Sequence, residues 1–116
     1  MRDLHVALGW ILIVANAMVG VWALAAHVVP MLRHRAGWVA VVVAQVIVAA
    51  QVVVGVIYQN TEDVEAARFH QLYGFAAFAS VGIIYAYRSE MRERPYLLYG
   101  LGSLWLMGLG LRAATL

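Results

Sequence analysis

The sequence predicts an all-α integral membrane protein, a bundle of four transmembrane helices in which helices adjacent in the chain run antiparallel. The chain is 65% hydrophobic and only 12% charged, whereas about a quarter of the residues in a soluble domain are charged. The apolar residues also form four runs, each close to the roughly 20 residues that a helix needs to cross a bilayer. These runs predict one domain over residues 1–116, with spans at about 4–29, 37–59, 66–87 and 95–112.

The first two spans, 4–29 and 37–59, are separated by the polar sequence Arg33-His34-Arg35. The first span is much longer than the apolar region of a cleaved signal peptide, about 7–15 residues, so we expect it to be retained. The second span is rich in valine, which favours strands in water. In lipid, however, open strands leave backbone groups without partners and four strands cannot close a barrel, so we expect a helix.

The third and fourth spans begin with typical helix-start residues. We expect Asn60 or Thr61 to cap the third helix, with the acidic residues that follow placed near the positive end of its dipole. Pro95 suits the first turn of the fourth helix, where its missing N–H costs nothing. All three connections are short, which makes neighbouring helices antiparallel.

The arginines predict an orientation in the membrane. All eight basic residues are arginine, which we take as an indication of a GC-rich bacterial genome. The positive-inside rule places the side with more arginines in the cytoplasm, so we expect both termini outside the inner membrane. The cytoplasmic arginines lie in the loops 33–35 and 88–94, and they are Arg33, Arg35, Arg88, Arg92 and Arg94.

Two segments share the pattern His-x-x-x-Gly-aromatic. They are residues 5–10 and 70–75, and each begins an odd-numbered span. This predicts two helical hairpins related by a parallel repeat, with the pseudo-axis along the membrane normal.

Small and polar residues form stripes on the predicted helices. Small residues let membrane helices approach closely, and polar side chains hydrogen-bond across such contacts. We therefore expect these positions to contact neighbouring helices or partner subunits. The residues are Gly9, Asn16 and Gly20 in the first span, Gln51 and Gly55 in the second, and Gly74 in the third.

Histidines are the only plausible reactive groups within or beside the spans. His5 and His70 begin parallel helices and so lie on the same side of the membrane. Two neutral imidazoles at matched depth on facing helices could ligate a haem iron from both faces. With no cysteine in the chain, we expect no thiolate metal site.

One part of the chain resembles a known family. Residues 51–58 have the form Gln-x-x-x-Gly-x-x-Tyr, and residues 69–75 read Phe-His-Gln-Leu-Tyr-Gly-Phe. Together they resemble the Gln-x-x-x-Gly stretch and the following histidine helix of haem A synthases and related cytochrome b-like four-helix bundles. The resemblance implies a haem b site with His70 as the best ligand candidate and His5 or His27 as its partner.

No protease, hydrolase or nucleotide-binding motif occurs, so we expect no enzymatic activity. Four spans with minimal loops predict a small accessory, assembly or regulatory subunit of a bacterial inner-membrane complex in respiration or envelope transport. Two alternatives remain open: a haem-b-binding electron-transfer protein, and a small homo-oligomeric transporter. The expected partners are the lipid bilayer and other membrane subunits. The formal charge of only +2 argues against nucleic acid.

Overall fold

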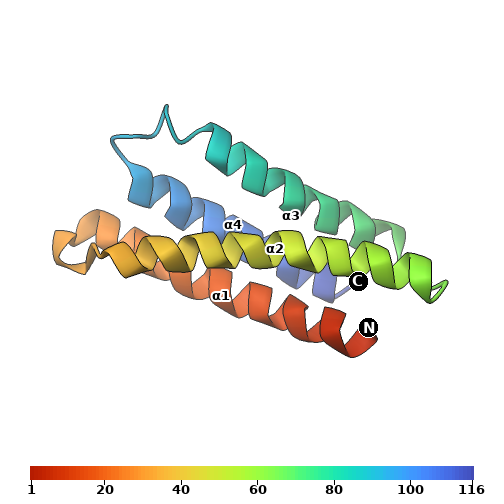
Figure 1. The fold of residues 1–116 in the computed structure, drawn as a ribbon. Helices are drawn as coiled ribbons and strands as arrows, with labels where there is room; N and C mark the ends of the chain where they lie inside the picture. Colours follow the sequence, from red (N-terminus) through yellow and green to blue (C-terminus); the bar gives the residue numbers. More distant parts are fainter.

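The computed structural model describes residues 1–116 and contains helices but no strands (Figure 1). The predicted fold class, an all-α four-helix bundle, is confirmed. The helices are α1 (Arg2–Val28), α2 (Arg35–Thr61), α3 (Arg68–Ala86) and α4 (Pro95–Ala114), with a short 3-10 turn, η1 (Pro30–Leu32), between α1 and α2.

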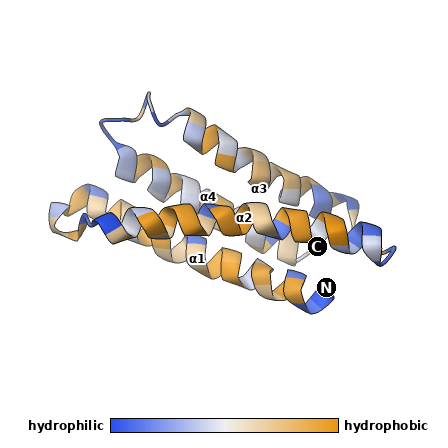
Figure 2. Ribbon diagram, viewed as in Figure 1, coloured by the Kyte–Doolittle hydropathy of each residue, from blue (hydrophilic) through white to orange (hydrophobic).

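All four helices are long and apolar enough to cross a bilayer, which supports a multi-pass membrane protein. α3 and α4 have 19 and 20 residues, or about 30 Å of helix, which matches the hydrocarbon core. α1 and α2 have 27 residues each and are longer than that core. Figure 2 shows the hydrophobic residues along the helices and the most hydrophilic residues gathered near the helix ends and in the loops.

The outer surface of the bundle is apolar. Only 17 of the 116 residues are buried, and large side chains such as Met18, Val21 and Val46 are exposed. A continuous apolar surface of this kind is unfavourable in water but is solvated by lipid tails. The arrangement of side chains therefore agrees with the membrane location that the helix lengths indicate.

The helices follow one another up and down through the bundle, so both termini lie at the same end (Figure 1). The most extensive helix contact joins α1 to α4, followed by the contacts of α1 with α2 and of α3 with α4. α2 and α3 contact each other much less. The bundle is therefore tightly packed across three of its helix interfaces and loosely packed across the fourth.

Glycines allow the close approach of α1 and α4. A Cβ atom at Gly20 would lie 3.2 Å from the backbone oxygen of Gly100, and one at Gly100 would lie 2.7 Å from the Leu24 side chain. In a bilayer such small residues bring backbones together and increase van der Waals contact. Gly20 thus contacts α4 closely, as expected for a packing residue.

The predicted cap of the third helix is wrong. Asn60 and Thr61 form the end of α2, and α3 begins after Ala67, which makes no side-chain capping bond. The chain turns between the two helices at Asp63, whose φ of 52° lies in the left-handed region that Asp tolerates. Helix α2 therefore continues through the polar residues that we expected to begin the next helix.

Candidate functional site

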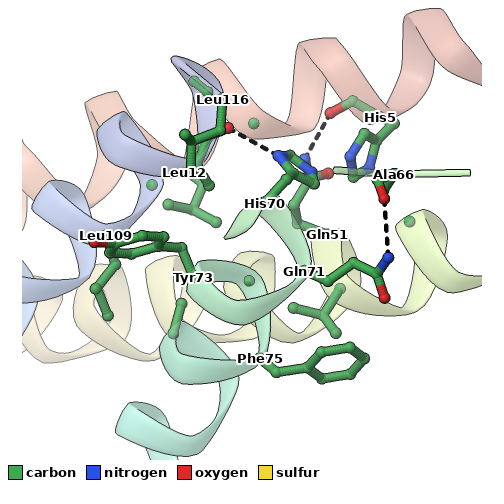
Figure 3. A pocket seen from close by; sticks show the side chains of 18 of the residues that line it. His5, Leu12, Gln51, Ala66, His70, Gln71, Tyr73, Phe75, Leu109 and Leu116 are labelled. Atoms are coloured by element: carbon green, nitrogen blue, oxygen red, sulfur yellow. Dashed lines mark hydrogen bonds between the residues drawn. The ribbon is translucent and has the colours of Figure 1, made fainter. Parts of the chain in front are cut away.

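A cavity lies at the end of the bundle that holds the two termini. Its volume is about 420 Å³, and side chains from all four helices, most of them hydrophobic, line it. We call it the histidine cavity, because His5 and His70 both line it (Figure 3). Ligand pockets of drug-sized molecules span about 300–1,000 Å³ and have the same mainly apolar lining with a few polar groups.

The two histidines come from helices that are not adjacent in the chain. His5 lies in the first turn of α1 and His70 in the first turn of α3. The two helices run in the same direction, so both residues reach the same end of the bundle. Their ring centroids are 5.9 Å apart, and the ring planes are inclined at 67°. The structure thus brings together the two imidazoles that the sequence placed on the same side of the membrane.

One ring nitrogen of His70 is hydrogen-bonded and the other is not. Its Nδ1 lies 2.8 Å from the backbone oxygen of Ala113 in the last turn of α4. A carbonyl only accepts hydrogen bonds, so Nδ1 carries a proton and donates it to Ala113, and Nε2 is left available to another partner. Metal-ligating histidines are usually held in this way, with the second ring N–H bonded to a carbonyl or carboxylate.

His5 is held through its backbone and leaves a ring nitrogen without a partner. Its backbone oxygen accepts a bond of 2.7 Å from Nε2 of Gln51. Its ring packs against α2, where a Cβ atom at Gly55 would lie 2.8 Å from Cε1 of the imidazole. The Nδ1 atom of His5 is buried and makes no hydrogen bond. Gln51 and Gly55 therefore position His5, which is the role of helix contact that we expected for them.

A glycine follows each histidine by four residues, and so lies one turn further along the same helix face. A Cβ atom at Gly9 would lie 3.1 Å from Nε2 of Gln51, whereas one at Gly74 would meet nothing within 4 Å. Gly9 therefore packs against α2, but Gly74 faces the open space of the histidine cavity instead of a neighbouring helix. Gly9 therefore lets the Gln51 amide approach α1, and Gly74 leaves open space on the His70 face of α3.

The remaining predicted residues lie elsewhere. His27 is in the last turn of α1, about 33 Å from His5 along the helix, so it does not join His70. Asn16 is fully buried in the middle of the bundle, where its Nδ2 donates to the backbone oxygen of Leu12 at 2.9 Å. Asn16 thus makes its bond within α1 and does not reach the histidine cavity.

Sequence reasoning missed two residues beside the site. Tyr73, one turn from His70, lines the cavity, and the guanidinium of Arg112 lies 5.9 Å from the centre of the Tyr73 ring. The spacing of three residues between His70 and Tyr73 could have placed Tyr73 on the same face of α3. No signal in the sequence linked Arg112 to this site, because that contact depends on how α3 packs against α4.

The number of ligands limits what the site can hold. No group of three or more His, Cys, Asp or Glu residues is arranged to bind a metal ion. A structural zinc ion needs four ligands and a catalytic one needs three from the protein. Haem iron carries four nitrogens of its own and takes at most two axial ligands from the protein. Two imidazoles are therefore too few for a bare zinc site and sufficient for a haem.

Comparison of the chain with protein-family models, curated proteins and solved structures finds no match. The resemblance to haem A synthases therefore stays a prediction.

Proposed function

We propose that this protein binds haem b in the histidine cavity and transfers electrons within the membrane, with His5 and His70 as the axial ligands. The observation that carries the proposal is the pairing of two imidazoles, with ring centroids 5.9 Å apart, inside a mainly apolar cavity. This is one of the alternatives that the sequence left open, and the structure gives it more support than the others.

The separation of the two rings brings both within reach of one metal ion. Histidine nitrogens lie about 2.0–2.1 Å from a bound metal, and the ring centroids of His5 and His70 are 5.9 Å apart. Nε2 of His70 would be one donor, since Nδ1 of that ring is held by Ala113. Nδ1 of His5, which is buried and has no partner, would be the other donor after the ring turns away from Gly55 toward the cavity.

The surroundings also suit a flat, apolar macrocycle. Gly74 opens the wall of the cavity beside His70, because a Cβ atom there would have no neighbour within 4 Å. Arg112, close to Tyr73 at the edge of the site, offers a positive charge for the carboxylates that haem carries. Haem supplies a one-electron redox centre, and the protein tunes it through axial ligands, hydrogen bonds and burial.

The chain's own residues hold the two ligands in place. The bond from His70 to the carbonyl oxygen of Ala113 fixes the tautomer and orientation of that ring and raises the basicity of Nε2. The bond from Gln51 to the backbone of His5 ties α1 to α2 at the level of the second ligand. Ligand geometry is therefore set by contacts among all four helices and not by loops.

The location that we propose is a bacterial inner membrane, with the arginine-rich loops in the cytoplasm and the histidine cavity near the outer face. We also propose that the protein works as a subunit of a larger membrane complex, because its exposed apolar helix flanks offer contact surface to other membrane helices. The transporter alternative stays a prediction, since no specific observation favours it.

The test is the absorption spectrum of the purified protein supplied with haem. We expect the wild type to show a sharp Soret band and the split bands of six-coordinate, low-spin haem after reduction. His5→Ala and His70→Ala are expected to lose that spectrum, whereas His27→Ala, a matched change on α1 far from the site, is expected to keep it. A His70→Gly variant should recover the spectrum when free imidazole is added, which a purely structural role would not predict. A wild type that binds no haem would contradict the proposal.

A further inference from the structure

A groove between α2 and α3 leads from the outside of the bundle toward the histidine cavity. Its volume is about 330 Å³, and every residue that lines it is apolar. We call it the α2–α3 groove. Its lining residues are Val52, Val53, Val56 and Ile57 on α2 and Phe75 and Phe78 on α3.

The groove and the histidine cavity share a wall. Val52, Val56 and Phe75 line both of them, so these three side chains stand between the two spaces. The wall lies at the one loosely packed interface of the bundle, since α2 and α3 contact each other far less than the other neighbouring pairs do. A movement of these three side chains would connect the cavity sideways with the surface of the bundle.

The groove opens at the level of the lipid tails. Val53 lies eight residues before the end of α2 at Thr61, or about 12 Å along the helix. Phe78 lies ten residues after the start of α3 at Arg68, or about 15 Å, which is half of the hydrocarbon thickness. Both residues are exposed, so the groove faces the interior of the bilayer.

The end of the cavity that faces water is bordered by polar contacts. The loop between α2 and α3 and the end of α4 both contribute lining residues there. The hydrogen bond from His70 to Ala113 and the 3.6 Å ion pair between the N-terminal amine and Glu62 join the segments at this end. A ligand arriving from water passes these polar and charged groups, whereas one arriving from lipid meets only apolar side chains at the loosest interface.

From this arrangement we propose that haem enters the histidine cavity sideways from the bilayer, through the α2–α3 groove. The inference rests on the proposed function, and it identifies the occupant of the groove as the apolar edge of haem dissolved in the membrane. Valine and phenylalanine side chains at the opening can move apart without exposing any polar group to lipid. The groove is then a route that haem passes through, and the bound ring lies beyond it in the histidine cavity.

The experiment measures how fast the Soret band appears when apoprotein in liposomes is mixed with liposomes that contain haem. A Val53→Trp variant fills the groove, and we expect it to slow haem uptake by at least about tenfold, equivalent to ~1.4 kcal/mol on the barrier, with the final spectrum unchanged. Val46→Trp is the matched control, because Val46 is also exposed, lies two turns away on the same face of α2, and lines neither space.

A reversible cross-link gives a second, independent test. The chain has no cysteine, so a Val53→Cys/Phe78→Cys variant can be joined across the groove with a cleavable thiol cross-linker. We expect the cross-linked apoprotein to take up haem slowly and to regain the wild-type rate after the linker is cleaved. Equal rates in the wild type, Val53→Trp and cross-linked proteins would overturn the sideways route alone. Absence of a Soret band in the wild type would overturn the proposed function, and the route with it.

Discussion

At one end of the bundle the four helices surround the histidine cavity, whereas at the other end three of the same helices close around aromatic rings. This aromatic cluster consists of Trp22 on α1, Trp38 on α2, and Tyr96 and Tyr99 on α4. Trp38 lies 5.8 Å from Trp22, 4.7 Å from Tyr96 and 5.4 Å from Tyr99, measured between ring centroids. These distances fall in the range that aromatic pairs prefer.

The two ends also differ in how completely their polar groups are satisfied. At the aromatic end, Nε1 of Trp22 donates to the backbone oxygen of Leu32, and Arg33 donates to the last turn of α1 while its guanidinium lies 4.9 Å from the centre of the Tyr96 ring. At the other end, Nδ1 of His5 and Oε1 of Gln51 are buried without partners. Unpaired buried polar atoms are costly in lipid. The difference agrees with the proposal that the histidine end receives a ligand while the aromatic end contributes mainly to stability.

The largest effect on stability is expected from Trp38→Ala at the aromatic end. The change removes three ring contacts at once, and large-to-small changes of this kind cost about 3–5 kcal/mol in water-soluble cores. We expect the free energy of unfolding to fall by about 3 kcal/mol, at the low end of that range. Lipid solvates the apolar surface left by the change better than water does, so most of the loss comes from packing contacts. The free energy of unfolding in mixed detergent micelles measures it.

Trp10→Ala is the matched control for that change. Trp10 is 55% exposed and lies on α1 at the histidine end. Its removal is expected to cost less than about 1 kcal/mol, as is usual for exposed side chains without specific contacts. Similar losses for both tryptophans would contradict the division of the bundle into a stabilising end and a ligand-binding end.

A pair of glycine substitutions sharpens the same comparison. A Cβ atom at Gly37 would overlap the Trp22 ring, whereas one at Gly74 would meet nothing within 4 Å. We expect Gly37→Ala to lower the free energy of unfolding by about 1–3 kcal/mol through overpacking. Gly74→Ala is expected to raise it by about 0.5–1 kcal/mol, the usual gain of alanine over glycine in a helix.

The same two glycine substitutions distinguish effects on stability from effects on haem binding. The methyl group added by Gly74→Ala enters the space beside His70, so we expect haem affinity to fall by about tenfold, or ~1.4 kcal/mol, while the protein becomes more stable. Gly37→Ala should leave the affinity of the folded fraction unchanged. Haem titration followed by absorbance measures both values, and a Gly74→Ala protein with unchanged affinity would show that the ring does not lie against α3 at this position.

The helices and the histidine pair followed from simple rules, but the packing did not. The four apolar runs predict the number of helices, and because consecutive helices alternate in direction, His5 and His70 lie at one end. Which helices touch is not encoded in the hydrophobic pattern, because lipid-facing and helix-facing sides are both apolar in a membrane. The loose contact between α2 and α3, the wall that the groove shares with the cavity, and the close approach of Gly37 to the Trp22 ring all depend on that packing. Asn60 and Thr61 failed as caps because polar residues end one membrane helix as readily as they begin the next.

The smallest effect concerns two glutamines on α2 that look alike in the sequence. Nε2 of Gln51 donates to the backbone of His5 at 2.7 Å, whereas Nε2 of Gln45 is buried and has no partner. Gln51→Leu should therefore destabilise the protein by about 0.5–1 kcal/mol, in the range measured for hydrogen bonds between membrane helices. Gln45→Leu replaces an unpaired amide with an apolar side chain and should be neutral or stabilising. Unfolding of the two variants side by side tests the sign of the difference. A larger loss of stability in Gln45→Leu than in Gln51→Leu would contradict this account. It would mean that the hydrogen bond from Gln51 to His5 does not hold α2 against α1 at the histidine end.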